Sequence, residues 1–482
     1  MVIPRFSHRI ILDFETTGLD KFRDGILEVF AKVICLASGR EIDSFKAACK
    51  SESFKIPSPR ALFANNYKVV NLVNSAHPLE VATSLFNFIK RYPNAEILAF
   101  NANFDFGFAY NAFFQSIKGD PYAFKTDGRS VICVMEIIRA LEATACSSKI
   151  TVPLINGARS FKQEDICFSS GIFYLAHSAE SDVRGLEKLL EIISLHHSDY
   201  LQKGRYFSKK SNALNFINSR PFFVTPIGFR NRYSVRCLVP LALCDKKINM
   251  LCADIGRFTQ MDFEHMQSRL NASDIAQRNL NEPEPHYPLI EVPLNKSKIF
   301  FDESYYECSD YGLSVGKEKL AERANAVFKN ASLQDFAERI LHFKKLRFEA
   351  FKTDDIEEKL FDDFPSSDEI GFTNDFDIVP VEDKYRFLIQ EKGNFKNNRY
   401  HKLARRFLLD AYPKNCDERA VEKFNEWKRC RLFGASNGKI RTFQDAGNEI
   451  SYLKRHHPNS MDRINEIENY LSFRKDEIEN AI

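Results

Sequence analysis

Apolar residues in the N-terminal part of the chain alternate between the spacing of strands and the spacing of helices. Continuous apolar runs predict strands over residues 9–15, 26–36 and 96–100, and residues 41–49 are a candidate for a further strand. Apolar positions at three- and four-residue intervals predict helices over residues 79–91, 106–117, 131–143 and 182–194. Strands mixed with helices favour a layered α/β domain, which we assign to residues 1–198.

Further along the chain the pattern changes twice. Short apolar runs punctuated by Pro and Gly predict a β-rich domain over residues 199–350. Residues 351–383 are a predicted acidic linker or a loop wrapped on the rest of the chain, because residues 354–383 contain twelve Asp or Glu and one Lys. Helical spacing then returns and predicts a helical C-terminal domain over residues 384–482. Three domains agree with a length of 482 residues.

The predicted β-rich region begins with a stretch that has no acidic residue. Between Tyr200 and Cys244 there is no Asp or Glu, and aromatic residues stand between the basic residues Lys203, Arg205, Lys209, Lys210, Arg220, Arg230, Arg232 and Arg236. Such a stretch suits single-stranded nucleic acid, because bases stack on aromatic rings and phosphates attract cations. The ordinary alternative is a β core of aromatic rings with the basic residues facing solvent. The net charge is only +3, so any surface for nucleic acid must be local.

The cysteines and the apolar runs bear on the location of the protein. The 11 cysteines include no Cys-x-x-Cys pair, so we expect free thiols, no zinc site and a reducing compartment. The N-terminus has no basic-then-apolar signal segment, and no run approaches the roughly 18 apolar residues of a membrane span. We therefore expect a cytoplasmic protein.

The first candidate for chemistry is the pair Asp13 and Glu15, at the end of the first predicted strand. Residues two apart on a strand point to the same face, so both carboxylates can reach one metal cluster. The pair is followed by Thr16-Thr17-Gly18, and a glycine there lets the backbone approach a ligand closely. The alternative is a strand-end pair of acids that faces solvent.

Two further strings add carboxylates and a histidine. Asn101-Ala102-Asn103-Phe104-Asp105 follows the predicted strand 96–100, and Asp105 either joins the acidic pair or only caps the helix that it opens. His177 comes before the predicted helix 182–194, and Asp182 lies in its first turn. With an ordinary pKa of about 6.5, a histidine is suited to act as a general base.

In this order the three strings resemble the DEDDh branch of the 3′→5′ exonucleases. The resemblance implies that Asp13, Glu15, Asp105 and Asp182 hold two Mg²⁺ ions, for which Mn²⁺ could substitute. It also implies that His177 takes a proton from the water that attacks a phosphodiester, which makes these five residues the catalytic set. The product would be a 5′-mononucleotide.

Other strings resemble the bacterial exonuclease I family in particular, and the resemblance covers about residues 8–435. They are Asp120-Pro121-Tyr122-Ala123-Phe124, Val134-Met135-Glu136-Ile137-Ile138-Arg139-Ala140, Arg159-Ser160-Phe161-Lys162, Arg399-Tyr400-His401-Lys402-Leu403, Tyr412-Pro413 and Trp427-Lys428-Arg429. The family architecture implies an α/β ribonuclease H-like exonuclease domain, then an SH3-like β domain and an all-α C-terminal domain that closes around single-stranded DNA.

The same resemblance implies contacts with the substrate and with a partner. The substrate-binding residues would be Glu15, Thr17, Phe104, Tyr122, Arg139 and Lys162. Tyr200 falls near the surface on which relatives dock the acidic C-terminal tail of single-strand-binding protein. Two positions depart from the family. Lys162 stands in place of an Arg, which removes a bidentate phosphate contact, and Cys133 stands where many relatives have Asp.

These observations predict a monomeric exodeoxyribonuclease that degrades single-stranded DNA from the 3′ end in repair and recombination. Two alternatives stay open at this point. The enzyme could act on RNA 3′ ends, because discrimination at the 2′-hydroxyl depends on the shape of the pocket. The chain could also be a catalytically inactive scaffold that binds single-stranded DNA.

Overall fold

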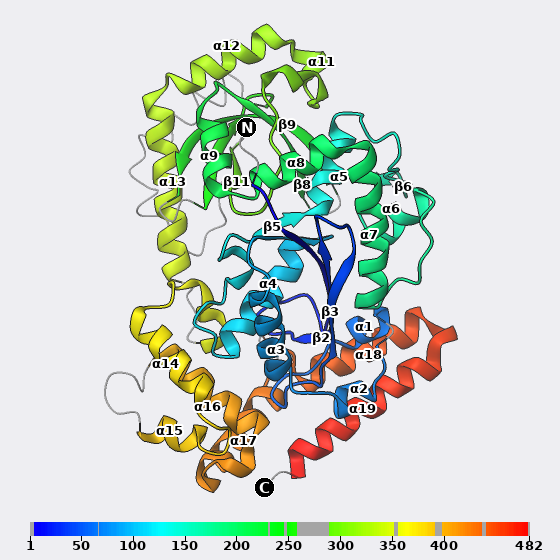
Figure 1. Ribbon diagram of the computed structural model, residues 1–482, viewed down its shortest axis with the longest axis vertical. Helices are drawn as coiled ribbons and strands as arrows, with labels where there is room; N and C mark the ends of the chain where they lie inside the picture. The colour runs from blue at the N-terminus through cyan, green and yellow to red at the C-terminus, as the bar shows by residue number, and fades with distance from the viewer. Residues whose placement is uncertain are drawn as a thin grey trace.

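The structure is a computed structural model that describes residues 4–65, 67–229, 232–244, 248–257, 289–350, 355–390, 398–435 and 440–480. Figure 1 shows an elongated molecule in which a central α/β region lies between a small β sheet at one end and a set of helices at the other. Helix α13 (Ala331–Ala350) runs along one side, from the small sheet toward the C-terminal helices.

The central region is built on a five-stranded sheet with the order β3-β2-β1-β4-β5. β1 (His8–Thr16), β2 (Ile26–Cys35) and β3 (Glu41–Ala48) pair antiparallel, whereas β4 (Ala95–Ala99) and β5 (Ser130–Cys133) run parallel to β1. The three strands predicted from apolar runs are confirmed, and so is the candidate strand over 41–49. The helix predicted over 131–143 is wrong in its first residues, because the short apolar strand β5 leads directly into α5 (Val134–Ala143).

Helices cover both faces of this sheet. α3 (Pro78–Lys90) and α4 (Ala102–Gln115) lie on one face, and α5, α6 (Gln163–Ser169) and α7 (Ala179–His196) lie on the other. Successive residues of β1 point to opposite faces, so Ile11 packs with the α7 side while Ile10 and Leu12 pack with α3 and α4. The other predicted helices are confirmed, with their ends shifted by a few residues.

The core on each face of the central sheet continues into one flanking region. The core under α5 and α7 includes Val239 and Phe300 of the small-sheet region. The core under α3 and α4 includes Tyr400 and Leu408 of the C-terminal helices. The three regions therefore share continuous apolar cores, which fixes them around the edge of the central sheet.

The small sheet has the antiparallel order β11-β10-β9-β8. Its strands are β8 (Phe223–Phe229), β9 (Arg232–Leu243), β10 (Asn249–Asp254) and β11 (Leu289–Pro293). Helices stand on both sides of it in the sequence: α8 (Ser198–Phe207), α9 (Lys210–Asn218), η2 (Glu303–Cys308), α11 (Gly312–Val315), α12 (Lys317–Phe328) and α13. Tyr200, Gly204 and Phe207 are all buried and recur at helical spacing, which explains why the acid-free stretch begins as helix.

Basic residues of the acid-free stretch pair with acids from other segments. Arg205 Nε lies 2.6 Å from a carboxylate oxygen of Glu96, and Arg220 Nε lies 3.6 Å from Glu303. Arg236 Nη1 lies 3.6 Å from Asp310. Arg230 and the side chain of Arg232 lie outside the described residues. For the described part of the stretch, these pairs favour the ordinary alternative over a surface for nucleic acid.

The acidic segment predicted over 351–383 is packed against the rest of the molecule, as the wrapped alternative expects and unlike a linker, but its described part is largely helical. Its described residues, which begin at Asp355, form η3 (Ile356–Phe361) and α14 (Ser367–Ile378). Glu357 is fully buried between Arg406 and Arg431, and Glu369 pairs with Arg399. The acids are neutralised by basic residues that follow them in the sequence. The composition of the segment does not show which of these residues pair with it.

The helical C-terminal region is confirmed by its described residues. It contains α15 (Lys384–Gln390), α16 (Arg399–Ala411), η5 (Pro413–Asn415), α17 (Glu418–Phe433), α18 (Phe443–His456), η6 (Pro458–Ser460) and α19 (Met461–Asn480). Short elements complete the central region: α1 (Pro59–Ala64), α2 (Asn71–Asn74), η1 (Ala123–Lys125), β6 (Leu154–Ile155) and β7 (Ala158–Arg159). Among the described residues, no helix is both long and apolar enough to cross a membrane.

Candidate active site

Three of the predicted carboxylates meet at the end of β1. Oxygen atoms of Asp13, Glu15 and Asp182 all lie within 4.8 Å of one another. Asp13 and Glu15 point to the same face of β1, as their spacing predicts. Asp182 comes from the first turn of α7, whose start is fixed by Ser178, since the Ser178 hydroxyl accepts the backbone N–H of Ser181 at 3.3 Å.

The fourth predicted carboxylate, Asp105, lies in the first turn of α4 and is buried. It is not among the three within 4.8 Å, but its negative charge raises the pKa of Asp13. Its carboxylate accepts its own backbone N–H and that of Phe14 in β1. Asp105 is thus both a helix-start residue and a member of the acidic group, which we call the carboxylate cluster (Asp13, Glu15, Asp105 and Asp182).

The carboxylate cluster carries more negative charge than its surroundings compensate. Burial, followed by repulsion from Asp105 and Asp182, raises the pKa of Asp13 well above its ordinary value. Burial and repulsion from Asp182 raise the pKa of Glu15 to about 8. Burial raises the pKa of Asp105 to about 7, although two backbone N–H donors oppose that rise. Hard divalent cations prefer such clustered oxygen donors, so the cluster suits one or more of them.

A further acid, Glu28, was not predicted as part of the site. It lies directly opposite Glu15 in the β1–β2 pairing. Burial raises the pKa of Glu28, and nearby Glu180 and Asp182 contribute to that rise, whereas Lys46 lowers it. The signal in the sequence is a single acid within the apolar run of β2, but only the strand register shows which residue it faces.

Asp182 is oriented by side chains that sequence reasoning did not single out. The Tyr174 hydroxyl hydrogen-bonds to the Asp182 carboxylate. Gln163 Nε2 lies 3.2 Å from the Tyr174 hydroxyl and donates to the backbone oxygen of Asp182 at 2.7 Å. The Tyr174 ring packs on Gly185, where an added Cβ would come within 2.9 Å of it. This glycine one turn after Asp182 makes room for the supporting tyrosine.

His177 lies at the rim of the carboxylate cluster. Its backbone N–H donates to Asp182 Oδ2 at 3.1 Å, and its backbone has a φ of 74°, a conformation that non-glycine residues seldom adopt. The imidazole Nε2 lies 3.2 Å from a carboxylate oxygen of Glu164, and the side chain is 51% exposed. The structure therefore places the predicted general base next to the cluster, with an acid beside its ring.

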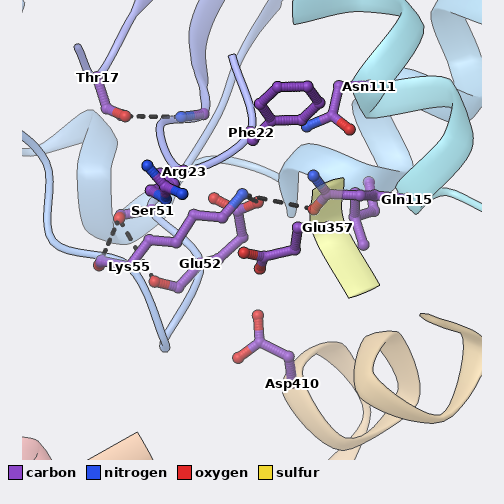
Figure 2. A network of polar contacts seen from close by, with 12 residues as sticks. Thr17, Phe22, Arg23, Ser51, Glu52, Lys55, Asn111, Gln115, Glu357 and Asp410 are labelled. Carbon is purple, nitrogen blue, oxygen red and sulfur yellow. Dashed lines mark hydrogen bonds and ion pairs between the residues drawn. The ribbon is translucent and has the colours of Figure 1, made fainter. Parts of the chain in front are cut away.

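The loop that follows Glu15 is held by a polar network, part of which Figure 2 shows. The Thr17 hydroxyl accepts the backbone N–H of Gly25 at 2.7 Å, so this predicted substrate-binding residue also closes the loop. Lys55, which is buried, contacts Glu52 at 2.8 Å and Gln115 at 3.4 Å. The loop is therefore fixed before any substrate arrives.

Two predicted aromatic contacts lie along α4. Phe104 is part-buried next to Asp105, and its ring lies 5.0 Å from that of Phe108. The Tyr122 ring lies 5.2 Å from Tyr110 and 5.7 Å from Phe364. Phe104 is carried by α4, and Tyr122 packs against Tyr110 of the same helix.

The predicted basic contacts differ in how far they are already paired. Arg139 Nη1 lies 2.7 Å from Glu136, an acid that it shares with Lys298, and its guanidinium lies 5.3 Å from the Phe161 ring. Lys162 is 73% exposed, with its Nζ 3.5 Å from Glu164. Cys133, at the position of the departure from the family, is buried at the start of α5.

Comparisons with known proteins agree with this geometry. Residues 10–189 match the family model RNase_T, described as exonuclease. The whole chain is similar to the structure of a moderately thermophilic exonuclease I from Methylocaldum szegediense, with 17% sequence identity and a TM-score of 0.80 over 97% of this chain and 99% of that chain. The chain has the exonuclease I fold.

Other structures with the exonuclease I fold are equally similar. E. coli exonuclease I in complex with a dA16 oligonucleotide has 17% identity and a TM-score of 0.80, over 98% of this chain and 100% of that chain. A complex described as single-strand-binding protein and exonuclease I with an inhibitor has 17% identity and a TM-score of 0.81, over the same shares. Among curated proteins, no sequence match is found. The predicted fold class and the predicted exonuclease domain are therefore confirmed.

Proposed function

We propose that this protein is a 3′→5′ exodeoxyribonuclease that degrades single-stranded DNA to 5′-mononucleotides. The observation that carries the proposal is the uncompensated acidic group Asp13, Glu15 and Asp182, which lies inside a domain that matches an exonuclease family model. The proposed substrate is supported by similar structures that are described as complexes with dA16 and dT13 oligonucleotides. We further propose that it acts as a monomer in the cytoplasm, in DNA repair and recombination.

The proposed metal requirement rests on the chemistry of the donors. Asp13, Glu15, Asp105 and Asp182 would hold two Mg²⁺ ions, or Mn²⁺ in their place, because these ions take carboxylate oxygens. The raised pKa values of Glu15 and Asp105 support this, since burial and repulsion from neighbouring acids make the ionised carboxylates costly without a cation. Bound ions of this kind supply Lewis-acid stabilisation of the charge that develops on a phosphodiester.

The chain itself would orient the acids and move the proton. Tyr174 and Gln163 hold Asp182 in place, and the backbone N–H groups of Phe14 and Asp105 hold the Asp105 carboxylate. His177 would accept the proton of the attacking water. One nitrogen of its imidazole faces Glu164, so that acid would stabilise the imidazolium after the transfer.

Substrate contacts and a protein partner complete the proposal. Phe104 and Tyr122 would pack on bases, and Lys162 would contact the phosphate at the reacting end. An acidic tail of single-strand-binding protein would dock near Tyr200. Lys203 Nζ lies 5.0 Å from the centre of the Tyr200 ring. The Tyr200 side chain is itself buried and its hydroxyl bonds to Thr144, so the docking contact would fall on its neighbours.

A time course with 5′-labelled single-stranded DNA and matched RNA in Mg²⁺ tests the proposal, with the Asp182→Ala variant beside the wild-type protein. We expect a DNA ladder that shortens from the 3′ end and is absent in the variant and in EDTA. Preferential trimming of RNA would move the assignment to a ribonuclease. Binding of DNA without cleavage of either substrate would identify an inactive scaffold instead.

A variant of the histidine separates its role from that of the acids. His177→Ala should slow cleavage roughly 10²- to 10⁴-fold, which is the range for the loss of a general base. Metal binding, measured by calorimetry, should remain in this variant. A variant that no longer binds metal would show that His177 belongs to the metal site instead.

A further inference from the structure

Three lysines from distant parts of the chain gather on one side of α4. They are Lys21 in the loop after β1, Lys125 at the end of η1 and Lys296 in the segment after β11, and we call them the lysine cluster. No ion pair is found for any of them among the residues that the structure describes. Other lysines of this region are paired: Lys118 contacts Asp377 at 2.7 Å, and Lys298 contacts Glu136 at 3.1 Å.

Lys21 is placed by α4 itself. Its backbone oxygen accepts a hydrogen bond from Asn111 Nδ2 at 2.6 Å. Its side chain lies over Gly107, where an added Cβ would come within 3.1 Å of Lys21 Cδ. The Nζ lies 4.7 Å from the centre of the Phe361 ring and 5.1 Å from that of Phe22. The ammonium group therefore sits among aromatic rings, close to the end of β1.

Lys125 approaches the same helix from the small-sheet side, and Lys296 directly follows the residue to which Lys125 bonds. Lys125 Nζ donates to the backbone oxygen of Asn295 at 2.8 Å and lies 5.9 Å from the Tyr110 ring of α4. The segment that carries Lys296 is fixed on the central sheet, because the Ser297 hydroxyl donates to the Val131 backbone oxygen at 2.5 Å. Lys296 itself is exposed. The cluster thus bridges two regions of the molecule.

The positive charge of Lys296 repels the ammonium groups of Lys21 and Lys125. Burial, and then the charge of Lys296, lowers the pKa of Lys125 to about 8. Burial and the charge of Lys296 also lower the pKa of Lys21, and Asp20 opposes that change only in part. Because these ammonium groups have no carboxylate partner among the described residues, an anion that binds between them would be stabilised.

Aromatic rings next to the lysine cluster narrow the class of anion. The rings of Tyr110, Tyr122 and Phe364 form a continuous series, with successive centres 5.2 and 5.7 Å apart. Phe364 is 79% exposed at the outer end of this series. Cations together with exposed rings suit single-stranded nucleic acid, where phosphates and bases alternate along one chain.

We propose that Lys21, Lys125 and Lys296 form a phosphate-binding subsite for the single-stranded chain upstream of its reacting end, with Phe364 as a platform for a base. The inference rests on the proposed function and adds residues to it. Gly107 and Asn111, which contact Lys21, share a face of α4 with Phe104 and not with Asp105. The subsite therefore lies beside Phe104, farther from the carboxylate cluster than the rise of roughly 7–8 Å between Asp105 and Tyr110 along the helix. It replaces the acid-free stretch as the main cationic surface for the substrate.

Equilibrium binding without turnover tests this subsite. The affinity of a labelled oligothymidylate is measured in EDTA over a series of salt concentrations, for the wild-type protein and for the triple variant Lys21→Gln, Lys125→Gln, Lys296→Gln. We expect the affinity at low salt to fall roughly ten- to a hundredfold. The slope of log K against log salt should become shallower by about 2, which is about 0.7 for each phosphate that the variant no longer neutralises.

A matched control separates a site from a general loss of charge. The triple variant Lys319→Gln, Lys329→Gln, Lys414→Gln removes the same charge from exposed positions on α12, at its C-terminal end and on η5. This control should bind as the wild-type protein does, and equal losses in both variants would overturn the subsite. The single variant Lys296→Gln, at an exposed position, should show about a third of the slope change even if the triple variant folds poorly.

Failure of the subsite differs from failure of the proposed function. A wild-type protein that cleaves DNA, and whose affinity and salt slope survive the lysine changes, would overturn the subsite alone. A protein that cleaves nothing but loses affinity with the lysine variant would keep the subsite and overturn the enzyme. A wild-type protein without affinity for single strands would overturn both.

Discussion

Two groups of buried carboxylates in this molecule have opposite electrostatic surroundings. Where the acidic segment meets the C-terminal helices, Glu357 lies between Arg406 and Arg431, at 2.9 and 2.8 Å. Burial raises the pKa of neighbouring Asp355, but these two arginines outweigh burial and hold it below the ordinary value. At the end of β1, burial raises the pKa of Asp13, and the neighbouring charges with the largest influence on it among the described residues are acidic and raise it further.

The difference shows which buried charges serve the fold and which serve a ligand. A buried charge costs free energy unless it is paired, so a paired group such as Glu357 is complete within the chain. The carboxylate cluster is incomplete, because it must take up either protons or cations. The lysine cluster repeats this situation with the opposite sign. Unbalanced charge at two places along α4 therefore indicates where a metal ion and a phosphate chain would bind.

The largest effect should follow from a change in the incomplete group. Asp13→Asn should reduce DNA cleavage by on the order of 10³-fold or more, about 4 kcal/mol of transition-state stabilisation, because it removes a metal ligand. The metal-free variant should be at least as stable as the wild-type protein, since the change removes repulsion. Cleavage rates and urea unfolding in EDTA measure the two effects.

The control for Asp13→Asn is the same isosteric change at Asp462, an exposed acid of α19. It should alter neither cleavage nor stability. A large loss of stability in Asp13→Asn would mean that the carboxylate supports the fold, as Glu357 does, and the contrast between the two groups would disappear.

The paired group should respond in the reverse manner. Glu357→Gln leaves Arg406 and Arg431 without their shared acid, and we expect it to lower the free energy of unfolding by about 3–5 kcal/mol. Urea unfolding of this variant, and of Glu382→Gln at an exposed position, measures the effect. An unchanged midpoint would show that solvent replaces the acid, in which case burial of Glu357 matters less than its complete enclosure indicates.

Proton uptake by Glu15 should make both the stability and the Mg²⁺ affinity of the protein depend on pH. Glu15 binds its proton up to about pH 8 in the folded protein, whereas its ordinary pKa is 4.5. The folded state therefore holds more protons than the unfolded state between these values, and stability in EDTA should fall as the pH rises through them. Metal binding must displace the proton, so Mg²⁺ affinity should increase from about pH 6 to about pH 8.

Calorimetry in two buffers of different ionisation enthalpy counts the protons released on Mg²⁺ binding. We expect net release near neutral pH, and Glu15→Gln should reduce it. Binding without proton release would indicate that the carboxylate cluster is already ionised, and would weaken the argument that its charge is uncompensated.

Local patterns in the sequence were sufficient to place only part of the carboxylate cluster. Asp13 and Glu15 share a face because strands repeat every two residues. The grouping of Asp182 and Asp105 with them was implied by the resemblance to the DEDDh exonucleases, because the start of a helix does not show which strand it faces. The same local reasoning missed β5, because four apolar residues before a helix look like part of that helix. It also expected a solvated acidic linker, because the arginines that neutralise Glu357 lie far along the chain.

Residues whose role depends on tertiary contacts could not be found this way. Lys21, Lys125 and Lys296 are far apart in the sequence and become a cluster only through the packing of loops near α4. Conversely, Arg205 belongs to the most basic stretch of the chain, yet it is paired with Glu96, which is fully buried. A high density of basic residues along the sequence is therefore a poorer guide to the proposed substrate surface than the lack of acidic partners around a lysine in the folded structure.

The smallest effect should come from a residue that supports the incomplete group without joining it. Tyr174→Phe keeps the ring on Gly185 but removes the hydroxyl that bonds to Asp182. Loss of such an outer contact usually weakens metal binding about 10- to 100-fold, and we expect a change at the lower end because Gln163 still holds the Asp182 backbone. Excess Mg²⁺ should largely restore the cleavage rate of this variant, whereas it should not restore Asp13→Asn. A rate that stays low at saturating Mg²⁺ would show that Tyr174 acts on the reaction itself. The tyrosine would then belong to the catalytic group and not to the residues that support it.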